Sequence, residues 1–179
     1  EAASVRAAGL AGLSDGQVQL ACPNGASDLL EALGNRAAKA ARSRLAQPDI
    51  AGMKIREKVA AAVRAYLAFL EPHKAAVKRA ASSPANLLSG PKGLWTGADA
   101  IWAGLGDKST DYNWYTKRVI LSGVLGSTLV AWIGTEDPAE VDAFLTVLDR
   151  EVAALRAARP SRLAPAPAAA RQEATVGAA

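Results

Sequence analysis

The sequence has very few of the residues on which enzyme chemistry usually depends. Its 179 residues include one histidine, His73, and one cysteine, Cys22. Nucleophilic triads, zinc sites and acid–base dyads need several such side chains or paired carboxylates. A di-iron bundle would need Glu-x-x-His pairs, and the sequence has none. A single cysteine also excludes an intramolecular disulfide. We therefore expect a protein that is not an enzyme.

Cations are missing from the first part of the chain, where the residue pattern otherwise suggests DNA binding. Residues 1–33 read as a short Ala-rich helix, a Gly-containing turn, a short helix from Ser14 and a Pro-Asn-Gly break. This order of short helices and turns is typical of a helix-turn-helix, and it resembles the amino-terminal end of the tetracycline-repressor class. No Lys or Arg lies between Arg6 and Arg36, although cations at phosphates supply most non-specific DNA affinity. We predict an inherited architecture that binds no nucleic acid, with a ligand-responsive repressor of the same class as the alternative.

The apolar runs are too short for a membrane span. Val119–Ile133 is an apolar run of 15 residues, whereas a span needs about 20. Lys and Arg exceed Asp and Glu by 21 to 17, a net charge of +4, which is compatible with an anionic membrane surface but does not prove such contact. We expect a soluble protein with peripheral membrane contact. Because the chain starts at Glu1 inside a helical pattern, we also expect that upstream residues are missing.

Apolar residues at helical spacing make up most of the remaining chain, and no strand pattern occurs. The spacing and the proline positions predict helices over about 28–46, 53–70, 73–81, 84–105, 111–133 and 138–157, with Ser27 or Asp28 capping the first of them. The predicted fold is therefore all-α. We divide it into a helix-turn-helix remnant (1–34), a helical bundle (35–157) and a disordered Ala/Pro-rich tail (158–179).

The helix from about Asp111 to Ile133 organises the rest of the chain. Beyond Val119 it is apolar around nearly its whole circumference, which predicts a central, buried helix. Its small residues, including Gly123 and Gly126, have two explanations: close contact with neighbouring helices, or a channel for a long apolar ligand. The four tryptophans, in this helix and the one before it, leave the same choice open.

The start of this helix combines aromatic and cationic residues. Tyr112, Trp114 and Tyr115 lie beside Lys117 and Arg118. Exposed Trp and Tyr are enriched at interface hot spots, so the group predicts a docking surface, although at least one ring could belong to the core.

The most specific resemblance comes from the segment G-D-K-S-T-D-Y-N-W-Y-T-K-R, Gly106 to Arg118. It resembles the signature of the ubiquinone (coenzyme Q) biosynthesis accessory proteins, the Coq-nine family. Four other segments agree in order and spacing: Lys54 to Leu67, Glu71 to Ala80, Leu94 to Trp102 and Ala143 to Val152. The likeness covers most of residues 1–156.

The resemblance implies a tetracycline-repressor-like bundle that has lost DNA binding, a pocket for isoprenoid or phospholipid, and partnership with the di-iron hydroxylase of ubiquinone synthesis. It implies no catalysis and no cofactor besides the bound lipid or isoprenoid quinone precursor. The family's partner-facing Asp, Trp and Tyr correspond to Asp111, Trp114 and Tyr115. With their neighbours, the predicted partner-binding residues are Asp111, Tyr112, Trp114, Tyr115, Lys117 and Arg118. From periodicity, the predicted lipid-binding residues are Trp95, Trp102, Leu105, Val124, Leu125, Leu129 and Trp132.

These expectations combine into one functional hypothesis. The protein draws an isoprenoid quinone precursor from the inner membrane and presents it to the ring hydroxylase, as a homodimer. We expect it in the bacterial cytoplasm at the inner membrane, or on the matrix side if it is mitochondrial. Family members often dock on the membrane through a terminal amphipathic helix, and the Pro-rich segment 158–179 argues against that mode here.

Overall fold

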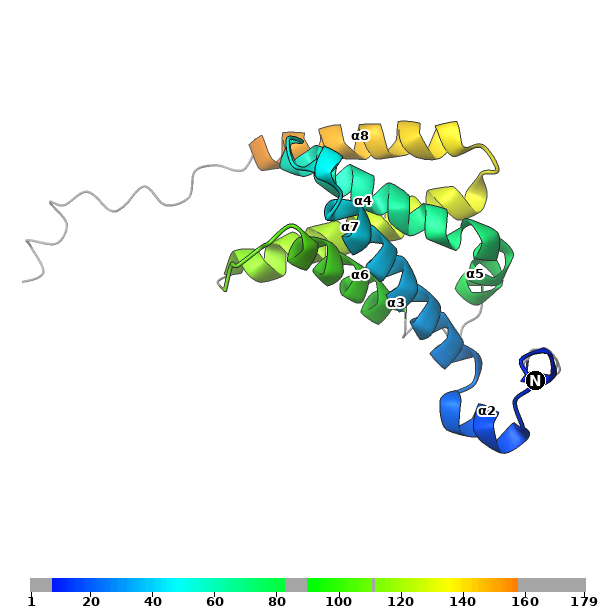
Figure 1. Ribbon diagram of the computed structural model, residues 1–179. Helices are drawn as coiled ribbons and strands as arrows, with labels where there is room; N and C mark the ends of the chain where they lie inside the picture. The colour runs from blue at the N-terminus through cyan, green and yellow to red at the C-terminus, as the bar shows by residue number, and fades with distance from the viewer. Residues whose placement is uncertain (1–7, 83–89, 111, 158–179) are drawn as a thin grey trace, which may run out of the picture. The chain divides into compact units, whose positions relative to one another are not determined.

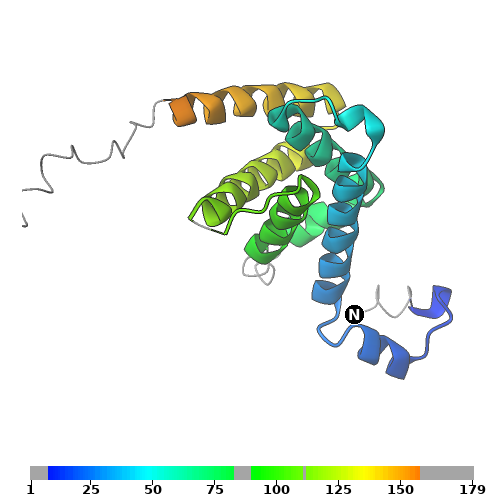
Figure 2. The same ribbon diagram turned by 60° about the vertical axis from the view of Figure 1, so that its left-hand side comes forward.

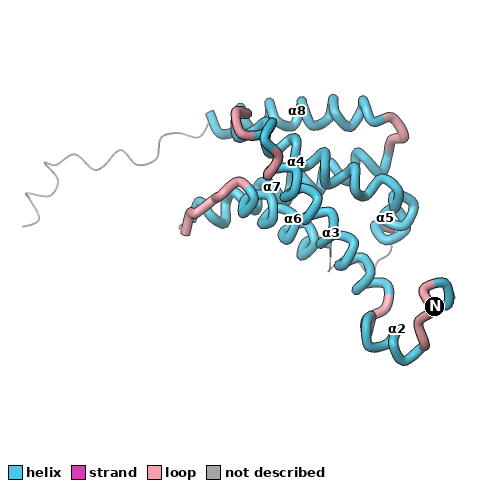
Figure 3. Tube along the Cα trace, viewed as in Figure 1, coloured by secondary structure: helices cyan, strands magenta, loops and turns pink. Residues whose placement is uncertain are grey.

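The computed structural model describes residues 8–82, 90–110 and 112–157. The chain divides into two compact units, Glu1–Leu145 and Thr146–Ala179. Every regular element in the described residues is helical, which confirms the predicted all-α class (Figures 1 and 3). Asp111 and the predicted tail, 158–179, lie outside the described residues. The predicted domain boundaries at residues 34 and 157 stay predictions, and α3 runs through the first of them.

The helix-turn-helix region contains α2 (Asp15–Ala21) and the start of α3 (Ala26–Leu45). The expected short helix begins here, and Ser14 caps it in a reciprocal arrangement with Gln17. The predicted cap of α3 is wrong, because Gly25 occupies that position with φ +62°. The carboxylate of Asp28 instead accepts hydrogen bonds from the backbone and side-chain amides of Asn24. A glycine supplies the positive φ that this tight entry into α3 requires.

The next elements follow the proline positions. A short 3₁₀ turn, η1 (Pro48–Ile50), leads to α4 (Ile55–Leu70). A second 3₁₀ turn, η2 (Glu71–His73), contains Pro72 and is followed directly by α5 (Lys74–Ala81). Proline cannot donate the backbone hydrogen bond that would continue α4. The chain therefore changes direction at η2, and this change brings Glu71 and Lys74 next to the end of a later helix.

The structural centre of the first unit is built from α3, α4, α6 (Gly90–Gly104) and α7 (Tyr112–Gly134). α3 packs on α4 and α6, and α6 packs along α7, as Figures 1 and 2 both show. Close approach depends on small residues, since Ala41, Ala62 and Ala98 are completely buried. A Cβ atom at Gly97 would lie 3.2 Å from Leu125 and 3.3 Å from Tyr66. Small side chains at these crossings thus let the backbones approach.

The expectation that α7 is buried all round is wrong. One face, including Leu121, Leu125 and Trp132, is buried in the core, while Val119 and Val130 on another face are exposed. Gly126 packs against Leu94, whereas a Cβ at Gly123 would meet no atom within 4 Å. By length and composition alone, α7 could also cross a membrane, a test that core helices of soluble proteins pass too.

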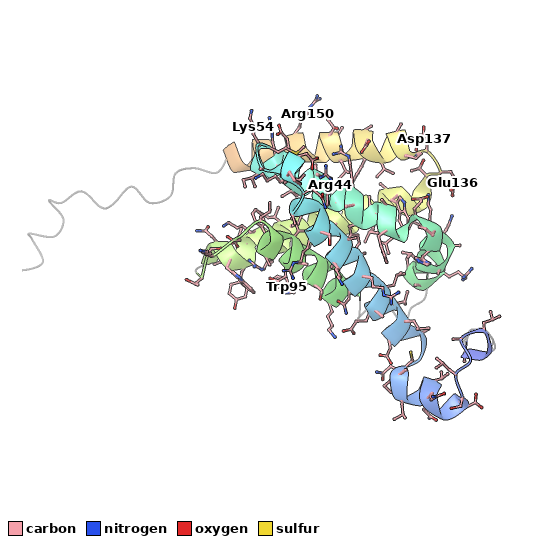
Figure 4. The ribbon with its side chains drawn as sticks, viewed as in Figure 1. Arg44, Lys54, Trp95, Glu136, Asp137 and Arg150 are labelled. Atoms are coloured by element: carbon pink, nitrogen blue, oxygen red, sulfur yellow. The ribbon has the colours of Figure 1, made fainter. Side chains whose placement is uncertain are left out.

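The last helix, α8 (Pro138–Ala157), begins at a proline as predicted. Its first part belongs to the first unit, where Val141 and Leu145 are buried in the core. The turn between α7 and α8 carries Glu136 and Asp137 (Figure 4). The side chain of Asp137 accepts a hydrogen bond from the backbone N–H of Ala139 at 2.9 Å and so caps α8.

Candidate functional site

An aromatic surface lies where α6 and the beginning of α7 pack together. Tyr112 and Tyr115 leave 75% and 60% of their surface exposed, whereas Trp114 is half-buried. Trp114 and Tyr115 meet edge to face, with their ring centroids 4.7 Å apart. Trp95 of α6, labelled in Figure 4, lies 5.8 Å from Trp114 and 6.4 Å from Tyr115. We call Trp95, Trp114 and Tyr115 the aromatic cluster.

A network of charged groups lies next to the aromatic cluster. Asp107, in the loop between α6 and α7, accepts hydrogen bonds from Lys117 Nζ at 2.7 Å and Arg118 Nη1 at 3.1 Å. The hydroxyl of Ser109 lies 2.8 and 2.9 Å from its two carboxylate oxygens. Arg118 Nε also donates to Asp99 of α6 at 2.6 Å. We call these five residues the ion cluster.

The ion cluster fixes the charge of Asp107. The hydrogen bond from Lys117 lowers the pKa of this carboxyl to about 2, and the hydrogen bonds from Ser109 and Arg118 act in the same direction against the opposing effect of burial. Only 7% of the Asp107 side chain is exposed. Asp107 is therefore a buried, ionised carboxylate at neutral pH, compensated by two cations.

The cations of the ion cluster also contact tryptophan rings. The guanidinium carbon of Arg118 lies 3.9 Å from the ring centroid of Trp114, and Arg118 Nη1 donates to the Trp114 carbonyl at 3.1 Å. Lys117 Nζ lies 5.4 Å from the Trp102 ring, and Trp102 Nε1 donates to the Lys117 carbonyl at 3.1 Å. Cation–ring contacts of this kind are favourable. The ion cluster and the aromatic cluster therefore form one connected structure.

The structure corrects the expected exposure of Arg118. Only 3% of its side chain is exposed, against 34% for Lys117. Arg118 lies on the face of α7 that packs toward α6, where Asp99 and Asp107 compensate its charge. The partner-binding role stays a prediction for all described members of the set, Tyr112, Trp114, Tyr115, Lys117 and Arg118. The buried Arg118 contacts the ring of Trp114. Asp111 lies outside the described residues.

Sequence reasoning missed Asp99 and Asp107. The available signal was weak: a carboxylate directly after a helix, ten positions before a Lys-Arg pair at the start of the next helix. Such a spacing allows an acidic and a basic side chain to form an ion pair across the loop, but it does not identify which side chains form it. The burial of Asp107 and Arg118 depends on how α6 packs on α7.

A second feature of the first unit is a groove of about 470 Å³ at the other end of α7. Its described lining comes from α4, η2, α5, the end of α7 and the start of α8. The apolar residues are Leu67, Ala68, Trp132, Pro138 and Val141, and the polar ones are Arg64, Glu71, Lys74, Thr135, Glu136, Asp137 and Asp142.

Trp132 forms the buried wall of this groove. Its Nε1 donates to Glu71 at 2.5 Å, and Lys74 Nζ lies 5.3 Å from its ring centroid. Lys74 also donates to the Thr135 carbonyl and lies 3.5 Å from Glu136. Arg64 of α4, also in the lining, pairs with Asp142 of α8 at 2.6 Å. The groove thus combines an apolar floor with a rim of paired charges.

The seven predicted lipid-binding residues do not meet around one cavity. Trp132 is the member of the set that lines the groove, and Trp95 belongs to the aromatic cluster. The other five lie in or against the hydrophobic core: Leu125 is buried, and Trp102, Leu105, Val124 and Leu129 are partly buried. The predicted lipid contacts stay predictions, and the groove points to residues of α4 and α8 that periodicity along α7 did not suggest.

Residues 88–158 match the sequence model of the family described as COQ9. No curated protein and no solved structure matches the chain, so the tetracycline-repressor likeness stays a prediction. The matched segment contains the aromatic cluster, the ion cluster and the whole of α7. It also contains the motif on which the sequence resemblance rested, and it confirms that resemblance. Over residues 88–158 the chain is therefore similar to the COQ9 family.

Proposed function

We propose that this protein is a non-catalytic accessory protein that binds the di-iron hydroxylase of ubiquinone synthesis and presents an isoprenoid quinone precursor to it. The observation that carries the proposal is the aromatic cluster between α6 and the start of α7. Its Tyr115 is exposed, and its half-buried Trp114 is held by Arg118 of the ion cluster. Large aromatic side chains that are already ordered lose little conformational entropy when a partner covers them. Such residues supply most of the energy at many protein interfaces.

The groove supports the ligand part of the proposal. Its volume of about 470 Å³ falls within the range of about 300–1,000 Å³ typical of small-molecule sites. Leu67, Trp132 and Val141 give it an apolar floor. Each CH₂ group of a prenyl or acyl chain buried there would contribute about 0.8 kcal/mol. We therefore place part of the ligand's apolar tail against Trp132, with the polar group near the charged rim.

The exposed face of α7 supports the predicted homodimer. Val119 and Val130 are 60% and 73% exposed, and Gly123 lies between them with open space around it. An apolar helix face of this kind is suited to packing against the same face of a second copy across a two-fold axis. Peripheral contact with the inner membrane, at its cytoplasmic or matrix side, completes the proposal because the ligand must come from the bilayer.

The docking step can be tested by titrating the purified hydroxylase into the purified protein. Tyr115→Ala removes an exposed ring without touching the ion cluster, and we expect it to weaken binding about 30-fold or more, equivalent to about 2 kcal/mol. Trp114→Ala should cost at least as much. Leu20→Ala is the matched control, since it removes an exposed apolar side chain on α2. Equal affinities for Tyr115→Ala and Leu20→Ala would count against the proposed surface.

The ligand step can be tested by mass spectrometry of lipids extracted from the purified protein. We expect isoprenoid quinone or phospholipid to co-purify. Ala68→Trp should reduce the amount by filling the groove from its exposed wall, whereas Ala75→Trp on α5, outside the groove, should not. A wild-type protein that carries no lipid would contradict the carrier role.

Nucleic-acid binding is not part of the proposal. The described residues of α2 and the first turns of α3 carry no Lys or Arg, so the phosphate contacts on which DNA affinity depends are missing. A salt-sensitive gel shift with duplex DNA at sub-micromolar protein would favour the repressor alternative instead.

A further inference from the structure

The side chain of Asp107 occupies a junction between two helices. α6 ends in Gly104, and the chain turns at Gly106 with φ +75°. The backbone N–H of Asp107 then donates to the Trp102 carbonyl at 3.1 Å, which fixes the residue against the end of α6. Its carboxylate points toward the first turns of α7. A single acidic group therefore connects the end of one helix to the beginning of the next.

The carboxylate holds two cations in fixed places. Lys117 Nζ donates to one oxygen at 2.7 Å, and Arg118 Nη1 donates to the other at 3.1 Å. Asp99 holds Arg118 from the α6 side at 2.6 Å. Only 3% of the Arg118 side chain is exposed, so its charge depends on these two carboxylates rather than on water. Removing the charge of Asp107 leaves a buried guanidinium with one of its two carboxylate partners, which favours rearrangement.

Each of these cations in turn contacts a tryptophan. Arg118 lies over Trp114 at 3.9 Å and bonds to its carbonyl oxygen. Lys117 lies near Trp102 at 5.4 Å. Trp114 contacts both other members of the aromatic cluster. A continuous path of contacts therefore runs from Asp107 through Arg118 to Trp114 and on to Trp95 and Tyr115.

We propose that Asp107 is a positioning residue of the docking surface: through Arg118 and Lys117 it holds Trp114 in the orientation in which the aromatic cluster meets the partner. Asp107 does not itself touch the partner. Its contribution is to order side chains before binding, and each ordered side chain is worth about 2- to 10-fold in affinity. This inference rests on the proposed docking function, but its first test requires no partner.

The first measurement is the set of four tryptophan indole N–H signals in the NMR spectrum of the free protein. Asp107→Asn keeps the shape of the side chain and removes its charge. We expect the signals of Trp102 and Trp114 to shift or broaden. Trp132 provides an internal control, because its indole donates to Glu71 at the other end of α7. Its signal should stay in place and report an intact core. Asp49→Asn, which breaks the surface pair with Arg44, should move none of the four.

The second measurement is hydroxylase affinity. We expect Asp107→Asn to weaken binding about 5- to 10-fold, Asp107→Glu to restore part of the loss, and Asp49→Asn to have no effect. If Asp107→Asn also disturbs the Trp132 signal, Ser109→Ala replaces it. Ser109→Ala is milder, because it removes only the hydroxyl that hydrogen-bonds to the Asp107 carboxylate. It should shift the Trp102 and Trp114 signals by less than Asp107→Asn does.

The outcomes separate the two proposals. Unchanged Trp102 and Trp114 signals in a folded variant would overturn the positioning role, whatever the partner does. Shifted signals with unchanged hydroxylase affinity would overturn its link to docking while leaving the docking surface itself intact. A wild-type protein that does not bind the hydroxylase would refute the proposed function, and with it the docking role of Asp107.

Discussion

Replacing Arg118 with methionine tests the ion cluster as a source of stability. Arg118→Met keeps most of the side-chain volume but removes three hydrogen bonds, to Asp99, to Asp107 and to the Trp114 carbonyl. Breaking a buried ion pair from one side typically costs about 3–5 kcal/mol. Here the side chain of Asp99 is 46% exposed and can rehydrate, and Asp107 keeps Lys117. We therefore expect Arg118→Met to lower the free energy of unfolding by an amount near the lower end of this range, about 3 kcal/mol.

The surface pair of Arg44 with Asp49 provides a matched control for this prediction. It also has two short hydrogen bonds, at 2.7 and 2.9 Å, but its side chains are 32% and 57% exposed, against 3% for Arg118. Exposed ion pairs contribute little to stability, so Arg44→Met should change it far less. Urea unfolding followed by tryptophan fluorescence measures both variants. If Arg118→Met lost no more stability than Arg44→Met, the reasoning from burial would be refuted.

Three further predictions concern pH, helix packing and assembly. Because the folded pKa of Asp107 is about 2, below the usual value of about 3.9, its stabilising contribution is present above about pH 4 and is lost as pH falls toward 2. Asp107→Asn should flatten this part of the profile in urea unfolding at pH 2–5, and equal slopes for both proteins would contradict the assignment. Gly123→Ala should raise stability by about 0.5–1 kcal/mol through helix propensity, whereas Gly97→Ala should lose this gain because its Cβ would crowd Leu125 and Tyr66. If thermal melts gave Gly97→Ala a higher melting temperature than Gly123→Ala, the side chains around Gly97 would accommodate a Cβ atom more easily than we expect. Val130→Glu should shift the protein from dimer to monomer in analytical ultracentrifugation without changing its circular dichroism, and a persistent dimer would exclude this face as the interface.

The helices were predictable because local patterns determine them. Ser14 caps α2 through its hydroxyl, Pro72 interrupts the path from α4 to α5, and Pro138 opens α8. These effects act within a few residues, so they can be read from the sequence without knowledge of the fold. The start of α3 was missed because the chain uses the positive φ of Gly25 rather than a side-chain cap, and both choices fit the same residues.

The site was predictable only in part because its groups meet across helices. α7 is so uniformly apolar after Val119 that periodicity does not separate its core face from its exposed face. The burial of Arg118 depends on Asp99 and Asp107, which lie on another helix and in a loop. Trp95 resembled the core residues of α6, and only the packing of α6 on α7 brings it to Trp114. The groove likewise depends on the turn that brings the start of α8 against α4.

The most direct test of the docking surface is hydrogen exchange of this protein with and without the hydroxylase. Trp114, Tyr115 and most of the ion cluster lie within residues 107–118, so a partner that covers this surface should slow amide exchange in this segment. We predict that the hydroxylase slows exchange in peptides covering residues 107–118, with smaller protection around Trp95. Protection confined to the groove between α4 and the start of α8, with residues 107–118 unchanged, would contradict the assignment of the aromatic cluster as the partner surface.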